Sequence, residues 1–365
     1  MKRRLRCVSW LLLACCFAFA GCVATPARQG ALLLIGGGLD DDQAVVYRRF
    51  VELAELAERP AGAPLRLAIV TAATGPEAEE ATDKTESLRV FAPAVEVVVL
   101  QRATTTADTV AAIDAASGLF FTGGDQQRIT DRYRQGDTDG PEYAAMQRLL
   151  RRGGVIAGAS AGCAMMGEQM FLGGSSARAL AARGAEPPLG PRLAAGMKFQ
   201  PWLLTDSHFF ERDRLGRLVA GLEAGPGRFG LGVGEAAAVE IDLASGVLVG
   251  VTEAESLLVD ARALYRDGLQ RRGLHARLVA AGDRVALRQW MQRPVSATIP
   301  TAPAEVRVVP VVEPGQNRQL ASWRLCRLAA AAAPGVVWSL PFDGWRVLAW
   351  PLPGRAFGLD VIVDA

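Results

Sequence analysis

The first half of the chain alternates short, continuous apolar runs with longer amphipathic stretches. The apolar runs have the length of strands and lie at 31–35, 65–71, 95–100, 118–122 and 155–158. The stretches between several of them, at about 42–57, 77–90, 106–116 and 142–152, have the pattern typical of helices. Apolar strands that alternate with helices indicate a parallel sheet with both faces covered. The sequence therefore predicts an α/β fold with a doubly wound, mostly parallel sheet.

Three of these predicted strands end in turns that are rich in small residues. Gly36-Gly37-Gly38 follows the first strand, Gly123-Gly124-Asp125-Gln126 follows the fourth, and Gly158-Ala159-Ser160-Ala161-Gly162 follows the fifth. The carboxyl ends of parallel strands meet at one edge of a sheet, where ligands bind in such folds. The first turn lacks the third glycine of a dinucleotide-binding fingerprint, because Asp41 stands there. We therefore expect a functional site at this edge, with no nucleotide cofactor.

The turn around Ser160 has the Gly-x-Ser-x-Gly pattern of a nucleophile elbow. An apolar strand enters the turn, and a helix-like pattern follows from Cys163. An elbow presents the serine hydroxyl above the sheet, and the following helix directs backbone N–H groups toward a developing negative charge. Small residues between a strand and a helix are also common as ordinary turns. From this turn alone, a catalytic nucleophile and a structural turn are both open interpretations.

Histidine is scarce, since the sequence contains only His208 and His275. If Ser160 needs an imidazole base, one of these two residues must supply it. His208 has the more suggestive surroundings, because Asp206 precedes it and three arginines follow it, at 212, 214 and 217. Guanidinium groups beside a candidate base favour recognition of an anion, although a solvated helix face would give the same spacing. Glu235 follows a glycine-rich turn and is a candidate to orient the imidazole through its second ring nitrogen.

The N-terminus has the parts of an export signal. Basic residues at 2–6 precede an apolar core at 8–20 that is too short to span a bilayer. Phe19-Ala20-Gly21-Cys22 resembles the lipobox of bacterial lipoproteins, in which the cysteine is acylated and becomes the first mature residue. We expect a signal peptide at 1–21, a lipid on Cys22, a tether at 22–30, and a place on the outer membrane facing the periplasm. Secretion without a lipid is the alternative.

Cysteine content, charge and ligand spacing narrow the possible functions. Of six cysteines, only Cys163 and Cys326 lie beyond Cys22, which is too few for a disulfide framework. No Cys/His spacing suggests zinc, and no other metal or cofactor is indicated. The formal net charge is +2, without a basic stretch interleaved with aromatics, so nucleic-acid binding has little support. Beyond about 262 the pattern changes, and we expect 263–365 to form a small C-terminal extension with a strand at 306–312.

Four motifs together resemble the cyanophycinase family of serine peptidases. This family belongs with the dipeptidase-E-like enzymes and has a flavodoxin-like fold related to class I glutamine amidotransferases. The motifs are Ile35-Gly36-Gly37-Gly38, Phe120-Phe121-Thr122-Gly123-Gly124-Asp125-Gln126, Gly158-Ala159-Ser160-Ala161-Gly162, and Asp206-Ser207-His208-Phe209 with the arginines that follow it. Their order and intervals fit as well as their residue types, over about 32–260. The resemblance implies one peptidase domain at 31–262.

The resemblance also implies roles for particular residues. Ser160 would be the nucleophile, His208 its base and Glu235 the third member of the triad. The oxyanion would lie on the N–H of Ala161 and on that of Gly123 or Gly124. The residues that would hold the substrate, a β-linked aspartyl-arginine peptide in this family, are Gln126, Asp206, Ser207, Arg212, Arg214 and Arg217.

The chain departs from the family pattern at two positions. Ser207 stands where the family has a glutamine that it uses in its specificity pocket, and Gly234 stands where the family usually has an aspartate. A related β-aspartyl or isoaspartyl peptide is therefore a second candidate substrate.

Two other readings of the chain stay open. The same elbow would serve an α/β-hydrolase esterase with His275 as base and Asp260 as acid. Alternatively, the chain would be a lipoprotein that kept the fold and binds peptides without cleaving them. The sequence leaves the oligomeric state open between a monomer and a homodimer.

Overall fold

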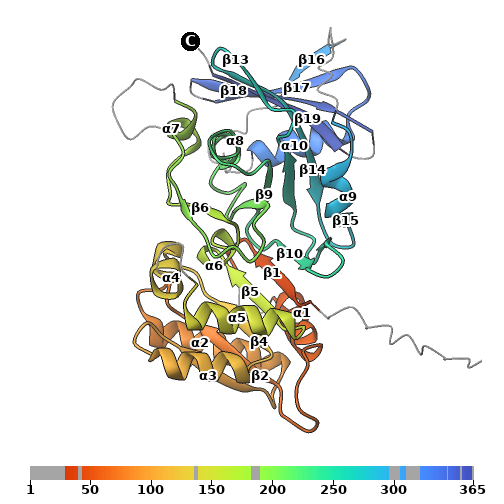
Figure 1. Cartoon of the computed structure of the whole chain (residues 1–365). Helices are drawn as coiled ribbons and strands as arrows, with labels where there is room; N and C mark the ends of the chain where they lie inside the picture. Colours follow the sequence, from red (N-terminus) through yellow and green to blue (C-terminus); the bar gives the residue numbers. More distant parts are fainter. Residues whose placement is uncertain are drawn as a thin grey trace, which may run out of the picture.

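The computed structural model describes residues 29–39, 43–134, 139–181, 190–295, 305–309, 321–342, 344–353 and 356–363. The expected signal peptide, Cys22 and all but the last two residues of the tether lie outside these ranges. The described chain forms two halves, each built on one sheet, with the short helix α6 (Ala161–Ala164) between them (Figure 1). No helix in these ranges is both long enough and apolar enough to cross a membrane.

The first sheet contains the strands that the apolar runs predict. Its order is β15-β11-β10-β1-β5-β4-β2-β3, and the section from β1 to β3 is parallel. The parallel strands begin and end within two residues of the predicted positions: β1 (Ala31–Ile35), β2 (Arg66–Val70), β3 (Glu96–Leu100), β4 (Gly118–Phe121) and β5 (Val155–Ala159). Antiparallel strands complete one edge: β10 (Ala238–Asp242), β11 (Val247–Gly250) and β15 (Arg284–Ala286).

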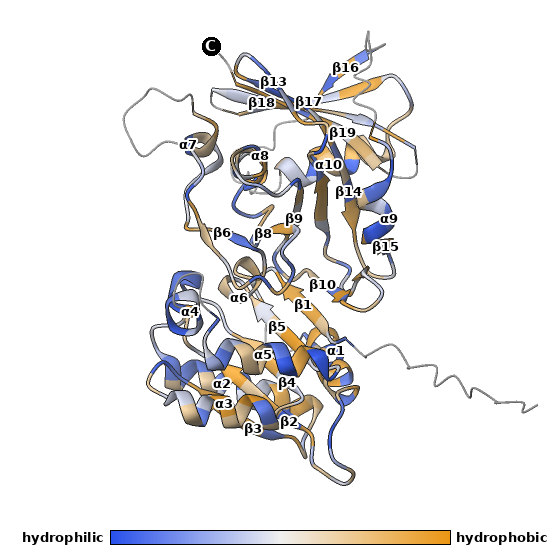
Figure 2. Ribbon diagram, in the orientation of Figure 1, coloured by the Kyte–Doolittle hydropathy of each residue, from blue (hydrophilic) through white to orange (hydrophobic). Residues whose placement is uncertain are grey.

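Helices cover both faces of this sheet. Leu33 and Ile35 of β1 pack into a core with residues of α1 (Ala44–Glu55) and α2 (Glu77–Phe91). Leu32 and Leu34 point to the opposite core, which includes residues of α3 (Thr106–Ala115) and α5 (Pro141–Arg151). Successive strand residues point to opposite faces, so a strand that is apolar throughout is buried on both sides. Figure 2 shows β1 as hydrophobic and the surface helix α4 (Gln126–Tyr133) as mostly hydrophilic. The predicted α/β class is confirmed.

The second sheet is larger than the sequence indicates. It has eleven strands in the order β16-β17-β18-β19-β14-β12-β9-β8-β6-β7, with β13 (Tyr265–Asp267) paired to β14. The strands from the first part of the chain are β6 (Gln169–Phe171), β7 (Leu193–Ala195), β8 (Leu203–Asp206), β9 (Phe229–Val233) and β12 (Ser256–Asp260). Those from the C-terminal part are β14 (Gln270–Val279), β16 (Glu305–Val308), β17 (Val336–Phe342), β18 (Trp345–Pro351) and β19 (Ala356–Val363).

The segment 263–365 is therefore not a small appendage. The expected boundary at 262 falls between β12 and β14, which are hydrogen-bonded neighbours. The same segment also contributes β15 to the first sheet and α9 (Leu287–Gln292) beside it. A strand is present near the predicted 306–312, at Glu305–Val308. Both sheets are completed by this segment, which corrects the expected division of the chain.

Three further helices belong to the second half of the molecule. α8 (Leu215–Ala224) and α10 (Ala321–Ala331) share a core with apolar residues of β12, β14 and β19. α7 (Ser176–Leu180) packs on α8. A separate core cluster includes residues of both sheets, such as Leu32 of the first and Leu231 of the second. This shared core fixes the two sheets relative to each other, with the turn around Ser160 between them.

Candidate active site

The turn after β5 has the strained backbone of a nucleophile elbow. Ser160 has φ 52° and ψ −103°, a combination that L-residues adopt rarely and at a cost of about 1–3 kcal/mol. The two flanking glycines allow the backbone to pass this closely around the serine. A Cβ on Gly158 would lie only 2.2 Å from the Gly162 carbonyl oxygen. A Cβ on Gly162 would lie 2.7 Å from the Phe121 carbonyl oxygen. The glycines at 158 and 162 are therefore required by close backbone contacts on either side of Ser160.

His208 lies in the loop that follows β8 of the second sheet. Its backbone also has a positive φ, 43°, and its N–H donates to the Gly36 carbonyl at 2.7 Å. Gly37 makes room for the ring, because a Cβ there would lie 2.3 Å from His208 Cε1. The glycine turn after β1 thus receives the histidine of a distant loop. The sequence indicated a site at this turn but not that its occupant would be the imidazole.

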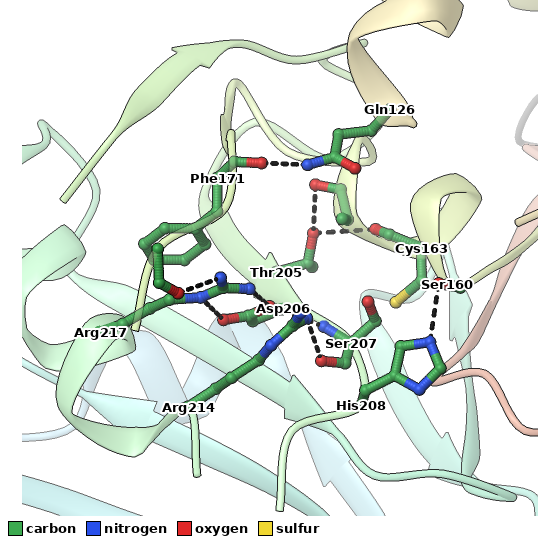
Figure 3. A network of polar contacts seen from close by, with 12 residues as sticks. Gln126, Ser160, Cys163, Phe171, Thr205, Asp206, Ser207, His208, Arg214 and Arg217 are labelled. Atoms are coloured by element: carbon green, nitrogen blue, oxygen red, sulfur yellow. Dashed lines mark hydrogen bonds and ion pairs between the residues drawn. The ribbon is translucent and has the colours of Figure 1, made fainter. Parts of the chain in front are cut away.

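Ser160, His208 and Glu235 form a continuous hydrogen-bonded chain. Ser160 Oγ lies 2.8 Å from His208 Nε2, as Figure 3 shows, and His208 Nδ1 lies 2.6 Å from Glu235 Oε1. Glu235 follows β9, and its backbone N–H donates to Glu211 Oε2 at 2.9 Å. The three residues come from different loops of both sheets. This is the geometry of a nucleophile, a base and an orienting carboxylate.

Burial keeps the imidazole in its basic form. Desolvation is the largest influence on His208 and lowers its pKa below the ordinary 6.5. The hydrogen bond that His208 donates to Glu235 opposes this shift, whereas Arg212 and Arg214 add to it. A neutral imidazole can accept the serine proton, so these surroundings suit a general base. The neighbouring Cys163 is fully buried, which raises the pKa of its thiol and keeps it protonated.

Two backbone N–H groups are available beside the serine. A Cβ placed on Gly123 would lie 3.4 Å from Ser160 Cβ, so the loop after β4 runs directly past the nucleophile. Within the described ranges, the N–H groups of Gly123 and Ala161 have no hydrogen-bond acceptor. Gly124 lies against another loop, since its Cβ would meet the Ala73 carbonyl oxygen at 2.3 Å. Of the two glycines proposed from the sequence, Gly123 is the better placed to donate to an oxyanion.

Asp206 is the centre of a buried ion network. Its side chain is completely buried and accepts hydrogen bonds from Arg217 Nε at 2.7 Å and Arg217 Nη2 at 2.6 Å. Arg214 Nη1 also donates to Asp206, at 3.0 Å, and to the Ser207 carbonyl at 2.6 Å (Figure 3). Arg217 lies over the Phe171 ring as well. Asp206 and Arg217 were predicted to hold substrate, and in the structure both side chains are buried and bonded to each other.

The other predicted binding residues differ in how available they are. Arg212 is exposed, and its side chain has no hydrogen bond or ion pair within the described ranges. Arg214 is partly exposed, and burial lowers its pKa to about 10, against the pull of Asp206. The Gln126 side chain donates to the Phe171 carbonyl, and Ser207 is 3% exposed. Arg212 is thus the guanidinium of this group that is free to meet a ligand.

His275 and Asp260, the base and acid of the esterase interpretation, are not part of the hydrogen-bonded chain of Ser160, His208 and Glu235. His275 is in the middle of β14, paired with Asp260 and Gly358 of the neighbouring strands. The Asp260 carboxylate accepts hydrogen bonds from Arg262, at 3.0 and 2.7 Å. Ser160 is bonded to His208 instead, which does not support the esterase reading. Within the described residues, no group of three or more His, Cys, Asp or Glu side chains could hold a metal ion.

Comparison of the sequence with known proteins finds partial similarity to cyanophycinases. The cyanophycinase of Trichormus variabilis is 36% identical over 127 residues, which make up 34% of this chain and 39% of that protein. The cyanophycinase of Synechococcus elongatus is 29% identical over 155 residues, 42% of this chain and 45% of that protein. The matched segments therefore span less than half of these relatives. No model of a known protein family matches the chain.

Structural comparison finds a peptidase fold. A solved peptidase from an acI-B1 actinobacterium aligns with 71% of this chain and 98% of its own, with a TM-score of 0.52. The sequences are 16% identical, so this likeness concerns the fold alone. It agrees with the fold expected from the four motifs. The predicted resemblance is confirmed: the chain has an α/β fold of the peptidase type and is similar in sequence to cyanophycinases over about a third of its length.

Proposed function

We propose that this protein is a serine peptidase that cleaves β-aspartyl peptide bonds through an acyl-enzyme. The observation that carries the proposal is the hydrogen-bonded chain from Ser160 to His208 to Glu235, with distances of 2.8 and 2.6 Å. A strained serine, a partly buried imidazole with a lowered pKa and a carboxylate on its second nitrogen are the parts that such a reaction needs. The similarity to cyanophycinases supports the choice of peptide substrate.

The reaction would proceed in two steps. His208 Nε2 accepts the proton of Ser160 Oγ as the oxygen attacks the scissile carbonyl carbon. The resulting oxyanion accepts hydrogen bonds from the N–H groups of Ala161 and Gly123, and Glu235 stabilises the imidazolium. The imidazolium then gives its proton to the leaving amine, which departs as the acyl-enzyme forms. Water, activated by the same imidazole, cleaves the ester and restores Ser160.

The charges near Ser160 favour an acidic substrate. The guanidinium of Arg212 is exposed, and that of Arg214 is partly exposed and fixed by Asp206. A guanidinium binds a carboxylate through two parallel hydrogen bonds. A β-linked aspartyl residue carries a free α-carboxylate or α-amide next to the bond to be cleaved, and Arg212 would bind the carboxylate form.

A panel of dipeptides tests the proposal. β-Asp-Arg, β-Asp-Lys and β-Asp-Leu are compared with the α-linked isomers, because Ser207 replaces the glutamine found in the similar family. We expect hydrolysis of β-linked members, and a loss of about 10³-fold or more in Ser160→Ala and in His208→Ala. His275→Gln is the matched control and should keep the wild-type rate. Full activity in Ser160→Ala would contradict the mechanism.

The same variants separate the remaining alternatives. An esterase that used His275 would lose activity in His275→Gln and keep it in His208→Ala. A peptide-binding protein without catalysis would leave Ser160 unlabelled by a fluorophosphonate probe while still binding β-aspartyl peptides. The bonded Ser160, His208 and Glu235 favour labelling.

We also propose that the protein is exported and anchored by a lipid on Cys22, on the outer membrane facing the periplasm. The lipobox-like sequence Phe19-Ala20-Gly21-Cys22 supports this proposal. Fractionation of cells that produce the full chain provides the test. We expect the wild type in the outer-membrane fraction and Cys22→Ala outside it. Equal distribution of the two forms would argue against the anchor.

A further inference from the structure

Helix α10, from the C-terminal part of the chain, contacts the loop that carries His208 and the turn just before β12. Ser322, the second residue of α10, donates its hydroxyl to Asp213 Oδ1 at 3.0 Å. Asp213 lies at the far end of the loop that starts at His208. The next residue, Trp323, donates Nε1–H to Glu255 Oε2 at 2.6 Å. Two successive residues of one helix therefore contact the His208 loop and the turn that precedes β12.

Glu255 lies next to the residue that precedes Glu235. Gly234 lies against the backbone of Glu255, because a Cβ on Gly234 would be 2.9 Å from the Glu255 carbonyl oxygen. Trp323 lines a cavity of about 170 Å³ together with Glu235, Glu255 and Glu211. Glu211, on the His208 loop, accepts the backbone N–H of Glu235 at 2.9 Å. The His208 loop is therefore tied to the turn of Glu235, and α10 reaches that turn only through Glu255.

The His208 loop needs such support because its backbone is strained at both ends. His208 has φ 43° and Asp213 has φ 46°, and neither residue is glycine. Each such residue costs about 1–3 kcal/mol and persists only where surrounding contacts hold it. At the His208 end, the backbone N–H is bonded to Gly36. At the Asp213 end, the carboxylate is bonded to Ser322, and the backbone carbonyl accepts from Ser176.

The helix itself is a fixed support. Ser322 is 1% exposed, and Leu325, Cys326 and Ala329 are completely buried in the core of the second sheet. α10 lies beside β14 and packs on β17 and β18 (Figure 1). A hydrogen bond from a buried, helix-fixed hydroxyl to a carboxylate is among the stronger kinds of side-chain contact.

We propose that Asp213 and Ser322 are positioning residues, through which the C-terminal segment holds the His208 loop so that the imidazole stays on Ser160. Neither residue touches a reacting atom. The effect on catalysis rests on the proposed function, whereas the ordering of the loop does not.

The test uses the full chain with Ser322→Ala, Asp213→Ala, the double variant, and Ser322→Thr, which keeps a hydroxyl. Two quantities are measured: hydrogen exchange of backbone amides in 207–214, and the rate of Ser160 labelling by a fluorophosphonate. We expect Ser322→Ala to speed exchange and slow labelling by about tenfold each, the cost of a lost hydrogen bond to a charged group. Ser322→Thr should restore both, and the double variant should be no worse than Asp213→Ala.

Cys326→Ala is the matched control on the same helix. It removes buried volume without a hydrogen bond to the His208 loop, so it should lower the Tm and leave the labelling rate unchanged. Equal exchange of 207–214 in Ser322→Ala and the wild type would overturn the proposal. If wild-type Ser160 is not labelled at all, the proposed function fails, and the exchange measurement still decides whether α10 holds the loop.

Discussion

The imidazole of His208 is partly buried and lies beside a carboxylate, and these two surroundings shift its pKa in opposite directions. Burial dominates, so the pKa lies below 6.5. The base must be neutral to act, and activity is therefore lost only as the pH falls through this lowered pKa. The surroundings of His208 therefore favour the neutral imidazole over the charged one, relative to an imidazole in water.

The pH profile of kcat/KM tests this shift. We expect the acidic limb of the wild type to lie below pH 6.5. Glu235→Gln removes an interaction that raises the His208 pKa, so its acidic limb should move to still lower pH. The plateau should also fall, on the order of 10³-fold, because the imidazole loses its orienting carboxylate. A limb above pH 6.5 in the wild type would contradict the burial of His208.

Gly37 lies directly against the imidazole of His208, so a larger side chain at this position would displace the ring. Gly37→Ala would place a methyl group 2.3 Å from His208 Cε1, at a φ of 107° that L-residues avoid. The ring must move, and with it the bond to Ser160, so we expect activity to fall by about 10²-fold or more. Gly62→Ala is the control, because Gly62 has φ 77° but no atom within 4 Å of its Cβ position. It should cost stability without affecting the peptidase assay; similar activity losses in both variants would refute this role.

At the scale of elements, the connection from β8 to α8 is organised by one buried carboxylate. Asp206 ends β8, Arg214 precedes α8, and Arg217 lies in its first turn. The bonds of Asp206 to both arginines fix the angle between the strand and the helix, and the His208 loop runs between them. The strand β8, the helix α8 and the His208 loop between them therefore share one ion network.

Asp206→Asn should destabilise the whole fold. It leaves Arg217, whose side chain is 5% exposed, without its counter-charge, and breaking a buried pair costs about 3–5 kcal/mol. Urea unfolding measures the change. Asp114→Asn is the matched control, because it breaks the pair with Arg148 in which both side chains are more than 40% exposed. That exposed pair should matter far less, and equal losses in the two variants would show that the Asp206 network is not structural.

The sequence predicts some of these elements well and others poorly for physical reasons. The strands from β1 to β5 are buried on both faces, so their apolar runs are unmistakable. The ion network of Asp206 was not predicted, because an aspartate beside a histidine looks the same in sequence whether it faces substrate or arginine. The sequence did contain one signal for this network. Asp206 and Arg217 are eleven residues apart, one at the end of a strand and the other near the start of a helix. The proximity of the Ser160 and Gly123 turns was easier to predict. Both turns follow parallel strands, whose carboxyl ends lie at the same edge of the sheet.

At the scale of the molecule, the C-terminal segment is part of the fold. β14 alternates buried and partly exposed residues and lacks an apolar run, so the sequence pattern does not reveal it as the neighbour of β12. β14 also pairs with β19, about 80 residues further along the chain, and the local hydrophobic pattern does not predict such distant partners. The same segment supplies α10, which contacts the His208 loop and the turn before β12. Fold and site therefore depend on residues far outside the four motifs.

Ending the chain after Arg262 tests this dependence. The truncated chain would keep every residue of the triad but would leave β12 without β14, although the side chains of Leu257, Leu258 and Val259 are completely buried in the whole protein. It would also remove the core that α10 shares with the second sheet. An exposed, apolar sheet edge favours aggregation. We expect the truncated protein to be insoluble, or to lack a cooperative thermal transition by circular dichroism and any labelling at Ser160.

The matched control changes the same segment at its outermost strand. Val306 and Val308 of β16 are 56% and 60% exposed, so Val306→Ser and Val308→Ser remove little buried surface. Both should keep the wild-type Tm and labelling rate. A truncated chain that unfolds cooperatively near the wild-type Tm and still labels at Ser160 would mean that 29–262 folds alone. In that case the strands after 262 would be an addition to a complete peptidase domain, because its core would not require β14 or α10.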